Sequence, residues 1–141
     1  MVILSYHYLR SPILKRVFFL LSLMLLPVII AAEIQYSPQY KSCMDKSGGV
    51  TLEMRICNGN ELKYQDKILN KNYKQAMKVL DTKHRAELKK VQRQWIKYRD
   101  AKCDFLFGLT GGTMDLLIGG SCYVDMTAKR AEELKDIITM M

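Results

Sequence analysis

The sequence contains a run of 47 residues, from Glu61 to Phe107, that has no glycine and no proline. Apolar residues recur along this run at helical spacing, first at Leu62, Leu69, Tyr73, Ala76, Met77 and Leu80, and then at Leu88, Val91, Trp95, Tyr98 and Ala101. One helix of that length would reach about 70 Å, whereas a domain of about 100 residues has a radius of gyration near 13 Å. We therefore predict two helices with a break at "LDTKH", where Asp81 or Thr82 can cap the second. One continuous helix through His84 is the alternative, because the apolar phase permits it.

The segments on either side of this run predict a short helix before it and a long one after it. Residues 33–50 show no steady period and indicate an extended lead and a turn, after which Thr51 can cap a short helix "LEMRIC" that "NGN" would end. Gly108 should end the second long helix, and a glycine-rich excursion follows as far as Ser121. The last helical stripe consists of Cys122, Met126, Arg130, Leu134 and Ile137 or Ile138. The pattern predicts an all-α fold, a small bundle of three main helices plus a short N-terminal helix.

The first 32 residues are typical of a secretory signal peptide. They contain Arg10, Lys15 and Arg16 but no acid, then the uncharged run "VFFLLSLMLLPVII", and they end in two alanines. We predict a signal peptide over residues 1–32, cleavage near Ala32, and one domain over residues 33–141 that is periplasmic or secreted and not embedded in a membrane. An uncleaved N-terminal anchor is the alternative, although the uncharged run is shorter than the roughly 20 residues that span a bilayer.

All four cysteines, Cys43, Cys57, Cys103 and Cys122, follow this segment. Export and an even count favour two disulfides, so we expect a disulfide-linked bundle. The spacings lack a C-x2-C pair, and His84 is the one histidine after residue 32, so we expect no metal site and no cofactor. Three pairings are open; the two local ones, Cys43–Cys57 and Cys103–Cys122, are favoured because each closes a loop rich in turn residues.

Charge and catalytic motifs exclude several classes of function. Residues 33–141 carry a formal charge of +5, and their basic residues are scattered among acids, which favours a solvated surface over a nucleic-acid partner. His84 has no fixed local partner, and Asp100 and Asp104 lie on one helix face beside lysines, as in a solvated charge cluster. "GLTGGTMD" lacks the Lys-Ser/Thr of a phosphate-binding loop. We therefore expect no enzyme and no catalytic residue.

Gln92, Trp95, Arg99 and Cys103 share one helical stripe, with Asp100 beside it. This row suits either a ligand site or the structural spine of the domain, and the spine is favoured. In that interpretation Trp95, Tyr98 and Cys103 face the core, and Arg99 stacks on the indole or pairs with an acid such as Glu61 or Asp66. Gln92 would bond to a loop carbonyl.

A resemblance emerges from five motifs taken in order: "TLEMRIC", "ELKYQDKILNKNYK", "LKKVQRQWIKYRDAKC", "GGTM" and "C-x3-MT-x2-R-x3-L". Together with the four cysteines, they resemble the N-terminal domain of the LprI lysozyme-inhibitor family over about residues 43–135. The residues that match the family pattern are Glu53, Cys57, Leu62, Asp66, Leu69, Asn70, Tyr73, Gln92, Trp95, Arg99, Asp100, Cys103, Thr127 and Arg130. The resemblance implies a disulfide-linked helical domain outside the cytoplasm and inhibition of lysozyme. It supplies no catalytic residues to carry over.

The partner expected from the resemblance is lysozyme or another cell-wall hydrolase. The positive charge favours a second hypothesis, a non-enzymatic protein that binds an anionic envelope component of the cell wall or lipopolysaccharide. For an inhibitor, the candidate contact is the excursion from Gly108 to Ser121, which carries Leu109, Met114, Leu116 and Leu117. The alternative is that these side chains cap the helix bundle.

Overall fold

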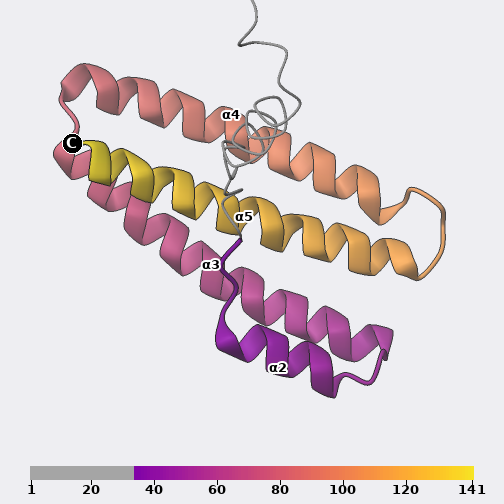
Figure 1. The fold of residues 1–141 in the computed structure, drawn as a ribbon. Coiled ribbons are helices and arrows are strands. Elements are labelled where there is room, and N and C mark those ends of the chain that lie inside the picture. The colour runs from indigo at the N-terminus through magenta and orange to yellow at the C-terminus, as the bar shows by residue number, and fades with distance from the viewer. Residues whose placement is uncertain (1–33) are drawn as a thin grey trace, which may run out of the picture. The chain divides into compact units, whose positions relative to one another are not determined.

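The computed structural model describes residues 34–141, which form one compact unit (Figure 1). The predicted signal peptide and its cleavage site lie outside these residues. The described part consists of four helices without strands: α2 (Pro38–Lys46), α3 (Thr51–Val79), α4 (Thr82–Phe107) and α5 (Met114–Met140). The all-α prediction, with three main helices and one short N-terminal helix, is confirmed. No helix within residues 34–141 is both long enough and apolar enough to cross a membrane.

The long glycine-free run is divided where the sequence predicts it. α3 ends at Val79, and α4 begins after Asp81, whose carboxylate accepts a hydrogen bond from the backbone N–H of His84 at 2.9 Å. This contact satisfies one of the orphan donors of the first helical turn. The alternative of one continuous helix is therefore wrong.

The short helix is α2 rather than the predicted one at residue 51. Ser37 caps α2 by accepting a hydrogen bond from the backbone N–H of Tyr40 at 3.2 Å, and Pro38 takes the first helical position, where its missing N–H costs nothing. The predicted "LEMRIC" helix is instead the first part of α3, which continues through Asn58 and Gly59. Asn58 is buried there: it accepts a hydrogen bond from the Tyr40 hydroxyl at 2.6 Å and donates one to Ser121 at 3.3 Å.

The last helix begins eight residues earlier than the stripe from Cys122 indicated. Gly119 and Gly120 are helical, and their lack of a side chain permits close packing. A Cβ atom at Gly119 would lie 2.6 Å from the Phe107 ring, and one at Gly120 would lie 3.0 Å from the Asn58 amide nitrogen. The sequence interpretation of this glycine pair as a turn is therefore wrong.

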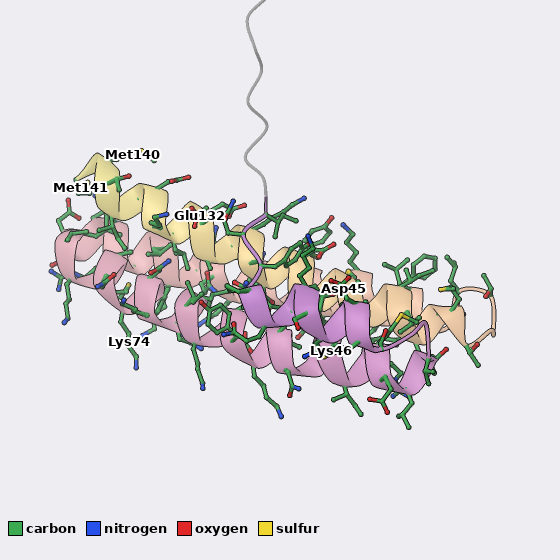
Figure 2. The ribbon with its side chains drawn as sticks, turned by 60° about the horizontal axis from the view of Figure 1, so that its bottom comes forward. Asp45, Lys46, Lys74, Glu132, Met140 and Met141 are labelled. Atoms are coloured by element: carbon green, nitrogen blue, oxygen red, sulfur yellow. A yellow bond between two sulfur atoms is a disulfide. The ribbon has the colours of Figure 1, made fainter. Side chains whose placement is uncertain are left out.

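Helix α5 packs against both α3 and α4, and α2 packs against α3 (Figure 1). Asn58 bonds to Ser121, and Asn72, further along α3, bonds to the carbonyl of Ala131, further along α5. Helices α3 and α5 therefore run parallel, while α4 returns in the opposite direction (Figure 1). The buried apolar cluster consists of Leu69, Ala76, Leu80, Leu88, Ala131 and Leu134. Figure 2 shows Met140 and Met141 at one end of the bundle and charged side chains such as Lys74 pointing outward.

Two disulfides link the helices. Cys43–Cys57 joins α2 to α3, and Cys103–Cys122 joins α4 to α5. These are the two local pairings that the sequence favoured. Each bridge therefore ties one of the peripheral helices to a neighbour in the bundle.

Candidate functional site

The loop between α4 and α5 is held from within by one carboxylate. Both the backbone N–H groups of Thr110 and Gly111 donate to Asp115 Oδ2, at 2.7 and 2.8 Å, and the Thr110 hydroxyl donates to Oδ1 at 2.8 Å. Gly111 has a φ of +76°, a left-handed conformation that favours glycine. Asp115 lies in the first turn of α5, where the helix dipole also favours an anion.

This arrangement changes the chemistry of the Asp115 carboxyl. The side chain is 1% exposed, yet its pKa lies below the usual range, chiefly because the Thr110 backbone N–H stabilises the charged form and against the opposing effect of desolvation. The negative charge of Asp115 is thus stabilised by hydrogen bonds from within the loop and does not face solvent. Sequence reasoning missed Asp115, although an acid two residues after Gly-Gly-Thr and at a helix start is the signal that could have found it.

The two ends of the loop are fixed by the helices that carry it. The Cys103–Cys122 bridge holds their Cα atoms 5.5 Å apart, and the Phe107 ring packs over Gly119 one turn into α5. Only the six residues 108–113 are non-helical, rather than the fourteen expected from Gly108 to Ser121. The loop is therefore short and rigidly mounted.

The four proposed contact residues fall into two groups. Leu109 in the loop and Met114 at the start of α5 are exposed, whereas Leu116 and Leu117 are partly buried on the first turns of α5. Leu116 lines a hollow of about 290 Å³ together with Leu62 of α3. The excursion thus has an exposed tip, while its next two apolar side chains are partly buried. A partner contact at the tip stays a prediction.

Exposed apolar side chains gather at this end of the molecule. The hollow beside Leu116 is also lined by Arg55 and Asn58 of α3, so the first turns of α3 lie next to the start of α5 (Figure 1). We define the loop surface as residues 108–113, which include the exposed Leu109, together with the exposed apolar side chains of the neighbouring helix turns. These are Leu52 and Ile56 on α3 and Met114 and Ile118 on α5. Exposed apolar groups of this kind often mark a protein-binding surface.

Arg99 links the three long helices at the predicted spine. Its guanidinium lies 5.1 Å from the centre of the Trp95 ring and 5.3 Å from that of Tyr123 on α5. It forms two hydrogen-bonded contacts with Asp100, at 2.8 and 2.9 Å, and its Nη1 lies 3.9 Å from Asp66 on α3. Stacking and ion pairing therefore both occur, and the acid from α3 is Asp66 rather than Glu61.

Gln92 has a different partner from the one expected. Its Oε1 accepts a hydrogen bond at 2.9 Å from Nε of Arg130, not from a loop residue, because a buried guanidinium on α5 faces it. Arg130 also pairs with Glu133 at 2.6 Å and lies 5.9 Å from the Trp95 ring. The spine thus consists of two arginines, Arg99 on α4 and Arg130 on α5, that both lie beside the Trp95 ring.

Two of the side chains expected to face the core do not do so fully. Trp95 is only partly buried at the margin of the apolar cluster, and Tyr98 is 59% exposed, whereas Cys103 is fully buried. Tyr98 points outward because α5 packs on the neighbouring face of α4, which carries Leu88 and Gln92. The row from Gln92 to Arg99 therefore combines a structural role with partial exposure.

A groove runs between α3 and α4 beside this row. Its volume is about 390 Å³, and its lining residues are Asp66, Leu69, Asn70, Tyr73, Lys89, Gln92, Arg93, Trp95, Ile96 and Arg99. Because α5 packs against both helices, α3 and α4 make few contacts with each other and leave this space open. The groove is the second candidate site.

The other titratable side chains that the sequence singled out pair with neighbouring side chains. Asp100 pairs with Arg99, while Asp104 accepts a hydrogen bond from Tyr123 at 2.8 Å, so the two carboxylates face different partners. Burial and that hydrogen bond raise the pKa of Tyr123 to about 12. His84 bonds to Asp81 at 2.8 Å on the surface, so the expectation that it has no fixed local partner is wrong. Residues 34–141 contain no cluster of His, Cys, Asp and Glu able to hold a metal ion.

Comparison with known proteins matches residues 43–134 to the family model described as "Lysozyme inhibitor LprI". The chain belongs to the LprI lysozyme-inhibitor family. It is also 29% identical over 101 residues to an uncharacterised protein of Rhizobium meliloti (strain 1021), an alignment that covers 62% of this chain and 73% of that relative. No solved structure matches the chain. LprI membership indicates an inhibitor rather than a catalyst, and with the two disulfides it indicates a protein that works outside the cytoplasm.

Proposed function

We propose that this protein inhibits a lysozyme-type cell-wall hydrolase by binding it through the loop surface. Membership of the LprI family supports the activity. The observation that carries the choice of surface is the loop itself, which Asp115 holds with three hydrogen bonds between two disulfide-linked helices. A loop fixed in this way loses little conformational entropy on binding, which is a main source of affinity in inhibitors.

The shape and charge of the loop suit a glycosidase cleft. Glycosidases of this type carry two carboxyl groups beside the bond that they cleave, so negative charge at the tip of the loop would meet like charge there. Residues 108–113 contain no acid, and Asp115 keeps its charge buried beneath them. Leu109 and Met114 offer apolar contact area at the exposed tip, while the partly buried Leu116 and Leu117 support it from below.

The first test is a charge placed at the tip. Leu109→Asp puts an unpaired carboxylate where the proposal places apolar contact, and it should weaken inhibition by about tenfold or more, since burying an unpaired charge costs more than 1.4 kcal/mol. Val91→Asp is the matched control, because Val91 is similarly exposed on α4 outside the loop surface. Inhibition constants are measured with the oxidised protein on a basic animal lysozyme and on a less basic bacterial muramidase.

The outcome separates this surface from others. Equal inhibition by the Leu109→Asp variant and wild type would show that the loop surface is not the contact. If wild-type protein slows neither enzyme at micromolar excess, the inhibitor proposal itself fails.

A further inference from the structure

The groove between α3 and α4 carries more positive charge than its acids balance. Its lining includes Lys89, Arg93 and Arg99 but a single acid, Asp66. Arg99 already pairs with Asp100 and approaches Asp66, whereas Lys89 and Arg93 form no ion pair within the described part of the chain. These two side chains are one helical turn apart and therefore neighbours on the same face of α4.

The positive charge on α4 is unfavourable for the stability of the helix itself. Residues 82–99 contain seven basic residues and one acid, Glu87, so the expectation that basic residues are scattered among acids rather than clustered is wrong for this helix. Like charges one turn apart repel each other, and cations near a helix N-terminus oppose the helix dipole. The first turn of α4 itself contains no acid, so the capping carboxylate of Asp81 is all that offsets them there. A ligand that is anionic would compensate this arrangement.

The neutral groups of the groove are mainly hydrogen-bond donors. The Tyr73 hydroxyl and the Trp95 indole N–H have no hydrogen-bond partner among residues 34–141, and the Gln92 amide uses only its oxygen, on Arg130. The free groups that only accept are fewer: the Asp66 carboxylate and the amide oxygen of Asn70, whose nitrogen donates to the Asp66 carbonyl at 2.8 Å. The groove therefore presents a donor-rich, cationic surface with two acceptors at one edge.

We infer that this groove binds an anionic saccharide, a sugar ring that carries a carboxylate or phosphate group. The negative group would pair with Lys89 and Arg93, and the sugar hydroxyls would use the neutral donors and the two acceptors. Leu69, Ile96 and the aromatic rings supply apolar contact for the ring itself, and a volume of about 390 Å³ suits a small ligand. An acidic peptide would match the two cations but would leave the aromatic and amide groups without a defined partner.

The site is independent of the loop surface and of the inhibitor proposal. It gives the second sequence-based hypothesis, an anionic envelope component, a defined place in the fold. Binding to the groove requires no hydrolase, so its measurement does not depend on inhibition.

The test is isothermal titration calorimetry of the oxidised full chain at low salt with four probes. These are N-acetylglucosaminyl-N-acetylmuramic acid, which carries a carboxylate, glucosamine 1-phosphate, the neutral disaccharide chitobiose, and hexaglutamate. At least one of the two anionic sugars should bind about tenfold more tightly than both chitobiose and hexaglutamate. A preference for the carboxylate indicates a cell-wall source, and a preference for the phosphate indicates a lipid headgroup.

A pair of double variants locates the binding. Lys89→Gln/Arg93→Gln should weaken binding of the preferred sugar by about tenfold or more, because it removes two charge-assisted hydrogen bonds. Lys67→Gln/Lys71→Gln removes the same charge at the same spacing from exposed positions outside the groove, and should leave affinity unchanged. Equal loss in both variants, preferential binding of chitobiose or hexaglutamate, or no binding of any probe would overturn the proposal.

Discussion

At the residue scale, Asp115 determines the loop although almost none of it reaches solvent. Its folded pKa is lowered by backbone and hydroxyl donors, so its contribution to stability is complete above the ordinary aspartate pKa of about 3.9 and is lost as the pH falls through the lower folded value. Protonation would leave the N–H groups of Thr110 and Gly111 with a weaker acceptor. The loop should therefore loosen in acid before the helices unfold.

Asp115→Asn tests this directly, because the amide places N–H groups where the loop presents donors. We expect the variant to be less stable than wild type at neutral pH and to show a shallower decline in stability between about pH 5 and pH 2. Urea unfolding followed by circular dichroism measures both. Asp136→Asn, at an exposed position on α5, should keep the wild-type decline; identical pH profiles for Asp115→Asn and wild type would contradict the role of Asp115.

The hydrogen bond between Gln92 and Arg130 is a second single contact on which the stability of the fold should depend. Gln92→Leu removes the acceptor of Arg130 Nε in a buried setting, and Nη2 of the same guanidinium already has no hydrogen-bond partner within the described residues. The loss should cost about 1–3 kcal/mol of unfolding free energy. Gln92→Glu keeps an oxygen acceptor and should cost less. A Gln92→Leu protein as stable as wild type would show that this contact does not hold α4 to α5.

At the element scale, the sequence predicted the helices that local signals define and missed those that packing defines. The capping Asp81 and the terminating Gly108 act within one turn of the chain, so the ends of α3 and α4 were predictable. Asn58 and Gly120 belong to helices because they pack against each other, and Asn58 also bonds to Tyr40 of α2; these are contacts between distant segments that no local window contains. For the same reason Arg130, the partner of Gln92, was not foreseen.

The two disulfides allow the loop to be separated from the rest of the fold. Each closes a loop of about 15–20 residues, so replacing either pair by serine should cost about 3 kcal/mol. The Cys103→Ser/Cys122→Ser variant should also lose inhibitory potency at temperatures where it is still folded, because its bridge fixes the ends of the loop. The Cys43→Ser/Cys57→Ser variant should keep potency under the same condition. Similar potency in both variants would contradict the assignment of the loop surface.

At the scale of the whole molecule, the central position of α5 produces two separate surfaces. Because α5 packs against both other long helices, the loop surface lies at the end where α4 meets α5, and the groove lies between α3 and α4. The first is apolar at its tip with its one acid buried, and the second is cationic. The two proposals therefore respond to ionic strength in opposite directions.

Salt should separate the two activities within one protein preparation. Residues 33–141 carry a formal charge of +5, so inhibition of a basic lysozyme proceeds against net repulsion, which is screened at 150 mM salt, where the Debye length is about 8 Å. Potency should hold or rise between about 20 and 150 mM salt. Binding of an anionic sugar to Lys89 and Arg93 depends on attraction, so its affinity should fall over the same range. Parallel salt profiles for inhibition and sugar binding would contradict two surfaces and indicate that one cationic region serves both.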